Sequence, residues 1–154
     1  MKILVPRDGS PVSDKALRKA IFFAKKLNYE IILLHIIDLK LLQSDSILKY
    51  INEKGALGKA KTQILRYLKE GSESILKNRI EAAKKERVRI RFTLGIGSTA
   101  EGIVSVAKSE RVDFIIIGST GLSSEGTEQN MVRVLGSVAR NVSELAECPV
   151  MIVK

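Results

Sequence analysis

Short apolar runs alternate with longer amphipathic stretches along the chain. The apolar runs are rich in β-branched residues and are bounded by charged or turn residues, which is typical of strands. They cover residues 2–6, 30–37, 88–94, 112–118 and 149–153. In the run 88–94 basic and apolar residues alternate at first, so this run predicts a strand with one wet face or a strand at a sheet edge. The other four runs predict strands that are buried on both faces.

The stretches between the strands predict helices. The first helix starts at Ser10 and Pro11, or at Ser13, and the others are expected over about 58–86, over about 99–109 and from a capping Ser137 onward. For residues 38–57 we expect a loop with a short helix. The positions expected to face inward are Ala16, Leu17, Ala20, Ile21, Ala24 and Leu27; Ile64, Leu68, Ile75 and Ala82 or Ala83; Ile103, Val104 and Ala107; and Val138, Val142 and Leu145.

This alternation of strand and helix predicts a single α/β domain over residues 1–154. Each crossover helix returns the chain to the same end of the sheet, so neighbouring strands pair in parallel. The expected product is a doubly wound domain with five strands. Ligands of such domains bind beyond the carboxyl ends of the strands, where the winding reverses. The loops at that end are 6–13, 37–57, 95–99 and 118–137.

Composition narrows the class of protein. A chain of 154 residues with a mean hydropathy of +0.06 predicts a soluble globular protein with one core. No apolar run is long enough for a membrane helix and residues 1–10 do not resemble a signal peptide, so the expected location is cytoplasmic. The only cysteine is Cys148 and the only histidine is His35, which excludes an internal disulfide and a zinc site built from Cys and His.

Positive charge is concentrated in one part of the sequence. The net charge of the chain is +9, and residues 54–91 hold twelve Lys or Arg against four Glu. Such a segment attracts polyanions. However, its only aromatic residue is Tyr67, with Phe92 directly after it, and the segment lacks the interleaving that stacking on bases requires. A solvated helix face is therefore favoured over a surface that binds nucleic acid or an acidic membrane.

The loop after the fourth strand is rich in glycine. Glycines stand at 118, 121, 126 and 136, directly before the helix that starts near Ser137. Residues without a Cβ let backbone N–H groups approach a ligand, and a helix start adds N–H donors and the positive end of a dipole. This combination suits a phosphate, although glycine-rich loops also simply form turns.

The loop after the first strand, PRDGS, places Asp8 where it can accept hydrogen bonds from an amino group or from ribose hydroxyls. It can equally cap the first helix. Arg7 is either an anion contact or the partner of Asp8. His35 lies within the apolar run IILLHII, where a histidine satisfied by a neighbour is favoured over a general base.

The sequence lacks a P-loop motif, and its one match to a dinucleotide-binding motif is incomplete. GIGSTA at 95–100 fits G-x-G-x-x-A, but the acidic residue expected about twenty positions later is missing, and Gly118 stands at the end of the next strand. No G-x-x-x-x-G-K-[ST] sequence occurs, so the chain is not a P-loop NTPase.

The chain resembles the universal stress proteins from end to end. The resemblance rests on KILVPRDGS, LLHIID, GSTAEGIV, VDFIIIGSTG and LGSVARNVSELAECPVMIV. It implies a parallel sheet of order 3-2-1-4-5, and it places the chain near the ATP-binding branch with the motif G-x2-G-x9-G-[ST]. Gly118 and Gly121 match the start of that motif, and Gly136 and Ser137 match its end.

The spacing of this motif departs from the family pattern. Residues 122–135 number fourteen where the motif has nine, which indicates five extra residues around Ser123 to Thr127. The insertion brings Glu125 and Glu128 near the expected phosphates, where like charge weakens binding unless both point to solvent. Carried over by position, the resemblance implies adenine and ribose contacts from Pro6, Asp8 and Ile36. It implies ribose and phosphate contacts from Gly118, Gly121, Gly136, Ser137 and Val138.

The resemblance predicts a regulatory or stress-response protein that binds ATP, with Mg²⁺ or Mn²⁺ arriving on the nucleotide, and at most slow ATP hydrolysis. It also implies a homodimer in which the last strand, Pro149 to Val153, pairs with its twin. The alternative is a dimeric interaction module of the same fold that binds no nucleotide.

Overall fold

The fold is given by a computed structural model of the chain. It describes residues 1–38, 66, 70, 71, 74, 76, 77, 79–81, 83–121 and 135–154. The elements are β1 (Lys2–Pro6), α1 (Pro11–Leu27), β2 (Glu30–Asp38), β3 (Arg89–Gly97), α4 (Thr99–Ser109), β4 (Phe114–Gly118), α5 (Ser137–Leu145) and β5 (Val150–Val153). Within these ranges no helix is long and apolar enough to cross a membrane.

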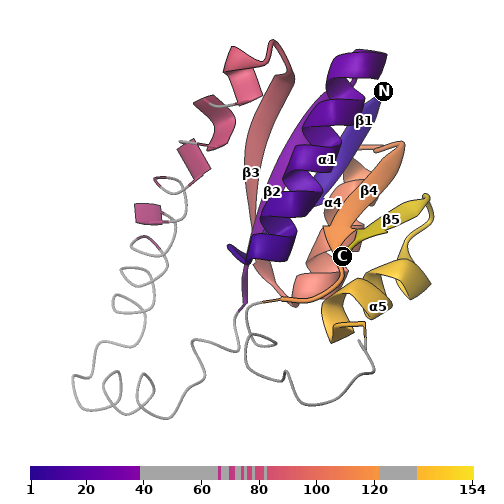
Figure 1. The fold of residues 1–154 in the computed structure, drawn as a ribbon. Coiled ribbons are helices and arrows are strands. Elements are labelled where there is room, and N and C mark those ends of the chain that lie inside the picture. Colours follow the sequence, from indigo (N-terminus) through magenta and orange to yellow (C-terminus); the bar gives the residue numbers. More distant parts are fainter. Residues whose placement is uncertain are drawn as a thin grey trace.

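The five strands form one parallel sheet in the order β3-β2-β1-β4-β5. The predicted doubly wound α/β fold and strand order are therefore confirmed. Helix α1 lies on one face of the sheet, and α4 and α5 lie on the other (Figure 1). The result is a sandwich of three layers.

Two apolar clusters fill the spaces between the layers. Because successive strand residues point to opposite faces, Ile3 and Val5 of β1 pack toward α1 while Leu4 packs toward α4 and α5. Leu76 and Ala83 belong to the cluster on the α1 side, so helical residues from the 58–86 stretch cover that face. Of the inward positions expected there, Ala83 is buried. Ile64, Leu68, Ile75 and Ala82 lie outside the described residues, as does the loop expected after Asp38.

Helix α1 begins where the sequence indicates. Ser10 is its N-cap, with a hydroxyl that accepts from the Ser13 N–H at 3.1 Å, and Pro11 occupies the first turn. The helix ends at Asn28, which adopts the left-handed conformation with φ of 55°. Leu27 was expected to face inward, but it is 51% exposed because it is the last residue of the helix and its side chain turns away from the core.

Other expected inward positions differ as well. Leu145, the last residue of α5, is 53% exposed, and Ala139 is buried in its place beside Val142. In α4 Ile103 and Ala107 are buried as predicted, whereas Val104 is only half-buried. At the end of a helix the last side chains extend beyond the core. The spacing of apolar residues alone does not predict this.

The third strand is a sheet edge, one of the two alternatives that its alternating pattern predicted, but it is longer than expected. It runs to Gly97 because pairing with β2 continues to the partners Ile37 and Ile96, and Asp38 and Gly97. At its other end Arg91 bonds to Glu30 and to Glu110, and Lys2 also contacts Glu110. The hydrogen bond from Arg91 is the main reason that the pKa of the Glu110 carboxyl lies below its usual value.

Candidate functional site

The winding of the sheet reverses between β1 and β4. The chain leaves β1 toward β2 on one side, whereas β4 and β5 lie on the other. The loop after β1 and the connection after β4 therefore leave the sheet side by side at the carboxyl ends of their strands. This is the position where open α/β sheets bind ligands.

Asp8 is held at this position by the loop that links β1 to α1. Its Oδ1 accepts from the Ser10 N–H at 2.9 Å, and Gly9 between them has φ of +94°, a conformation that favours glycine. Asp8 is exposed at the surface of the site. A Cβ built on Gly121 would lie 2.8 Å from Asp8 Oδ2, so the loops after β1 and β4 touch here. The structure thus brings together two residues that the sequence analysis placed in one site.

Helix α5 begins beside these two loops. Gly136 is its N-cap and Ser137 its first helical residue, so the prediction that Ser137 caps the helix is wrong. The Gly136 N–H donates to the Ser119 carbonyl at 2.8 Å, which leaves this amide unavailable to a ligand. The N–H groups of Ser137, Val138 and Ala139 form no hydrogen bond within the part of the chain that the structure describes. Three backbone donors therefore remain at the positive end of the helix dipole.

Gly118, at the end of β4, is packed against the start of α1. A Cβ on Gly118 would lie 3.1 Å from Val12 Cγ1 and 3.2 Å from the Ser13 nitrogen. The glycine thus lets the first turn of α1 lie close on the sheet. This contact gives Gly118 a packing role. The predicted contact of Gly118 with a ligand stays a prediction.

Apolar residues border the site on the α4 and α5 side of the sheet. Pro6 is buried at the end of β1, and Ile36 and Val138 pack against the cluster that fills this layer. The side chain of Ile36 lies over two glycines, since a Cβ on Gly95 would overlap Ile36 Cδ1 and one on Gly102 would lie 3.1 Å from the same atom.

Arg7 pairs with an acidic residue other than Asp8. Its buried guanidinium bonds to Asp14 through Nε at 2.9 Å, and Arg79 bonds to the other oxygen of Asp14 at 2.7 Å. The suggested pairing of Arg7 with Asp8 is therefore wrong, whereas the suggested anion contact stays a prediction. Sequence reasoning missed Asp14, although an acidic residue in the first turn of a helix is a recognisable signal.

His35 is satisfied by the protein, as expected. Its Nδ1 donates to the carbonyl oxygen of Arg7 at 2.8 Å. This bond fixes the ring against the loop that carries Asp8.

Metal ligands do not gather in the described ranges. No group of three or more His, Cys, Asp or Glu side chains converges there. Near the start of α4, Thr99 Oγ1 donates to Asp38 Oδ2 at 3.4 Å. Gly126, Glu125, Glu128 and the rest of the predicted insertion lie outside the described residues.

The fold and these contacts define a doubly wound α/β domain with a candidate ligand site at the switch point of its sheet. The chain belongs to the universal stress protein family, whose family model matches residues 1–154. The resemblance inferred from sequence is confirmed at this level.

Relatives match nearly the whole chain. Universal stress protein YxiE of Bacillus subtilis is 34% identical over 155 residues, covering 99% of this chain and 98% of the relative. Universal stress protein MJ0577 of Methanocaldococcus jannaschii is 33% identical over 158 residues, covering 99% and 94%. The solved structure of MJ0577 matches with a TM-score of 0.78 and 29% identity over 99% of this chain and 94% of that one.

Two further solved structures are described as nucleotide complexes. One is a universal stress protein in complex with cAMP, with a TM-score of 0.65 and 21% identity over 99% of this chain and 95% of that one. The other is a universal stress protein from Archaeoglobus fulgidus in complex with dAMP, with a TM-score of 0.60 and 22% identity over 100% and 98%. At these identities the likeness concerns the fold alone.

Proposed function

We propose that this protein binds an adenine nucleotide, ATP, at the switch point between β1 and β4 and acts as a regulatory or stress-response protein. The observation that carries the proposal is that Asp8 lies against Gly121 beside the N-cap of α5, where the N–H groups of Ser137, Val138 and Ala139 form no hydrogen bond with any residue that the structure describes. A carboxylate accepts hydrogen bonds from a ribose or an amino group, and a helix start stabilises a phosphate. The same fold in distant relatives accommodates adenine nucleotides.

Each residue has a proposed part in this binding. Asp8 accepts from the ribose, and Pro6 and Ile36 provide apolar surface for the adenine. Gly121, Gly136, Ser137 and Val138, with Gly118 behind them, border the ribose and phosphates. In this proposal Ser137 and Val138 donate through their backbone, while Gly136 contributes by position since its N–H is bonded to Ser119.

We propose binding rather than catalysis as the main activity, with hydrolysis at most slow. A divalent ion, Mg²⁺ or Mn²⁺, would arrive with the phosphates and would be held largely by them. Phosphate oxygens are the ligands that these ions prefer in nucleotide sites.

Ser137 offers a sharp test because it is the first residue of α5. Proline is well tolerated at that position, and Gly136 before it already has the extended conformation that proline requires, with φ of −59° and ψ of 150°. Ser137→Pro therefore removes one N–H donor and leaves the helix intact. We expect ATP affinity, measured by isothermal calorimetry, to fall about tenfold or more, as for loss of a hydrogen bond to a charged group.

Two controls accompany this variant. Ser137→Ala removes the hydroxyl but keeps the N–H, so the difference between the two variants isolates the backbone donor. Asp8→Ala should weaken ATP binding as well, whereas Glu144→Ala, which removes an exposed carboxylate of α5, should not. Absence of heat and of a thermal shift with the unmodified protein at millimolar ATP would refute the proposal and favour the interaction module that binds no nucleotide.

We also propose that the protein forms a homodimer through β5. This strand stands at the end of the sheet order, and Met151 in it is 38% exposed. An edge strand with exposed apolar residues is a template for pairing, and a twin strand would cover it.

A further inference from the structure

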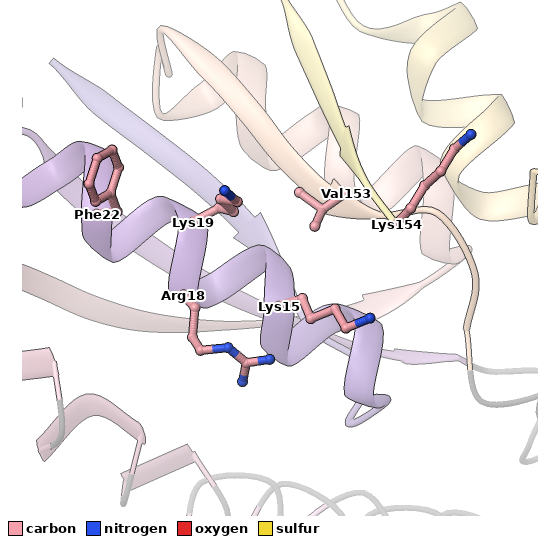
Figure 2. Close-up of a pocket in the computed structure, with 6 residues that line it drawn as sticks. All are labelled: Lys15, Arg18, Lys19, Phe22, Val153 and Lys154. Carbon is pink, nitrogen blue, oxygen red and sulfur yellow. The ribbon is translucent and has the colours of Figure 1, made fainter.

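A hollow with a positively charged rim lies between α1 and the end of β5, and it shares no residue with the candidate nucleotide site. Its volume is about 350 Å³. Figure 2 shows side chains projecting from α1, with the last residues of β5 across from them. The lining residues are Lys15, Arg18, Lys19, Phe22, Val153 and Lys154.

The four cations of this groove have no anionic partner among the described residues. Elsewhere Lys25 pairs with Glu86, and Lys108 pairs with Glu147. By contrast, Lys15, Arg18, Lys19 and Lys154 form no ion pair or side-chain hydrogen bond with any residue that the structure describes. Four like charges around one hollow repel one another, and a bound anion would relieve that repulsion.

An aromatic ring stands among these cations. Phe22 is 56% exposed, and it shares one helix face with Lys15, Arg18 and Lys19 because these residues are spaced three, four and seven positions apart. Phe23 packs edge-on against the ring, with centroids 5.6 Å apart and planes at 75°. The ring of Phe22 is thus supported on one side and presented to solvent beside the charges.

We propose that this groove binds single-stranded nucleic acid. The four cations contact successive phosphates, and a base stacks on Phe22; this pairing of a basic groove with an exposed ring is how proteins hold single strands without reading their sequence. The net charge of +9 and the pI of about 9.8 favour the approach of such a polyanion. An acidic peptide would satisfy the cations but gives Phe22 no stacking partner. The segment 54–91, which lacks interleaved aromatic residues, plays no part in this proposal.

Salt dependence provides the first test. The affinity for a fluorescein-labelled oligothymidylate of twelve nucleotides would be measured by fluorescence anisotropy at several salt concentrations. Four phosphate contacts predict that log K falls against log salt with a slope of about −2.8. This corresponds to a loss of about fiftyfold between 50 and 200 mM salt. No binding at low salt, or an affinity that salt does not change, would overturn the proposal.

Variants of the groove provide the second test. The double variant Lys15→Gln and Lys19→Gln should halve the slope to about −1.4. Phe22→Leu keeps an apolar side chain but removes the ring, and should weaken binding about fivefold or more with the slope unchanged. The matched control is Lys84→Gln with Lys85→Gln, which removes two exposed charges from the other basic segment and should change nothing.

Three outcomes would contradict the location or the ligand. Loss of binding in the control rather than in the groove variant would place the contact in residues 54–91. Unchanged binding by Phe22→Leu, together with equal competition by a peptide of eight glutamates, would indicate a surface for acidic peptides. Loss of oligonucleotide binding in Asp8→Ala would place the strand in the switch-point site, since that variant leaves the groove intact. All variants would first be matched for thermal unfolding.

Discussion

At the scale of single residues, three glycines near the candidate site are needed for three different reasons. A Cβ at Gly118 would press on the start of α1, and one at Gly121 would press on Asp8. A Cβ at Gly136 would lie 3.2 Å from the Ser119 carbonyl oxygen that its own N–H contacts. The glycine-rich composition of this region therefore reflects close contacts within the protein as well as any approach of a ligand.

Gly118 should be sensitive to the smallest enlargement. Gly118→Ala places a methyl group 3.2 Å from backbone atoms of Val12 and Ser13, which cannot move aside as a flexible side chain would. We expect a loss of about 1–3 kcal/mol in the free energy of unfolding, measured with urea.

Gly71 supplies the matched control for this substitution. It is helical and exposed, and a Cβ there would meet nothing within 4 Å. Gly71→Ala should therefore raise the stability by about 0.5–1 kcal/mol, since glycine is the poorer helix former. Equal effects of the two substitutions would contradict a packing role for Gly118.

Apolar periodicity located the loops after β1 and β4 and the start of α5 at one end of the sheet, and the family resemblance then assigned Asp8 and Gly121 to one site. Sequence reasoning did not find the pairing of Arg7 with Asp14. These residues are seven positions apart and are joined through a turn whose path depends on Gly9. Such a contact depends on the direction of side chains, which the pattern of apolar and polar positions does not contain.

At the scale of elements, the helices begin in different ways. Helix α1 has a side-chain cap from Ser10, which is almost fully buried. Helix α4 has Ser98 at the same position, but its hydroxyl caps no N–H group. Helix α5 starts at a glycine and has no side-chain cap. Of these three starts, the one of α5 lies beside Gly121 in the candidate site, since a Cβ on Gly136 would lie 4.0 Å from the Gly121 nitrogen.

The two serine caps should therefore differ in their contribution to stability. Ser10→Ala leaves the buried N–H of Ser13 without its acceptor, and we expect a loss of about 1–2 kcal/mol in the free energy of unfolding. Ser98→Ala removes no capping bond and should cost less than about 0.5 kcal/mol. Thermal or urea unfolding of both variants checks this. A larger loss of stability in Ser98→Ala than in Ser10→Ala would contradict the capping bonds described for the two helices.

The bounds of the elements were predictable where apolar runs end at charged residues, as for β1 and β2. The end of β3 was not, because Gly95 and Gly97 read as a turn although pairing with β2 continues through them. Backbone pairing with a neighbour outweighs the weak strand preference of glycine, and the sequence of one strand does not reveal its neighbour.

At the scale of the whole molecule, the alternation of strands and helices was enough to predict a parallel doubly wound sheet. The remaining strand order came from the family resemblance. The sheet has two edges, β3 and β5, and both carry an exposed apolar residue: Ile96 is 56% exposed and Met151 is 38% exposed. Only the β5 edge is proposed to pair with a twin.

This proposal predicts a difference between the two edges. Met151→Lys adds a charge to the pairing edge and should convert the dimer to a monomer at micromolar concentration, as measured by sedimentation velocity. Ile96→Lys makes the same kind of change at the opposite edge and should leave the dimer intact. A monomeric unmodified protein, or dissociation by Ile96→Lys alone, would exclude a dimer through β5.

The packing of Ile36 over Gly95 and Gly102 also constrains how this sequence can evolve. A methyl group at Gly95 would overlap the δ-carbon of Ile36, and one at Gly102 would lie 3.1 Å from the same atom. Homologous chains that carry alanine at position 95 or 102 should therefore have a shorter residue, such as valine or alanine, at position 36. Position 36 would then change together with position 95 or 102. The apolar surface proposed for the adenine would become smaller as a result.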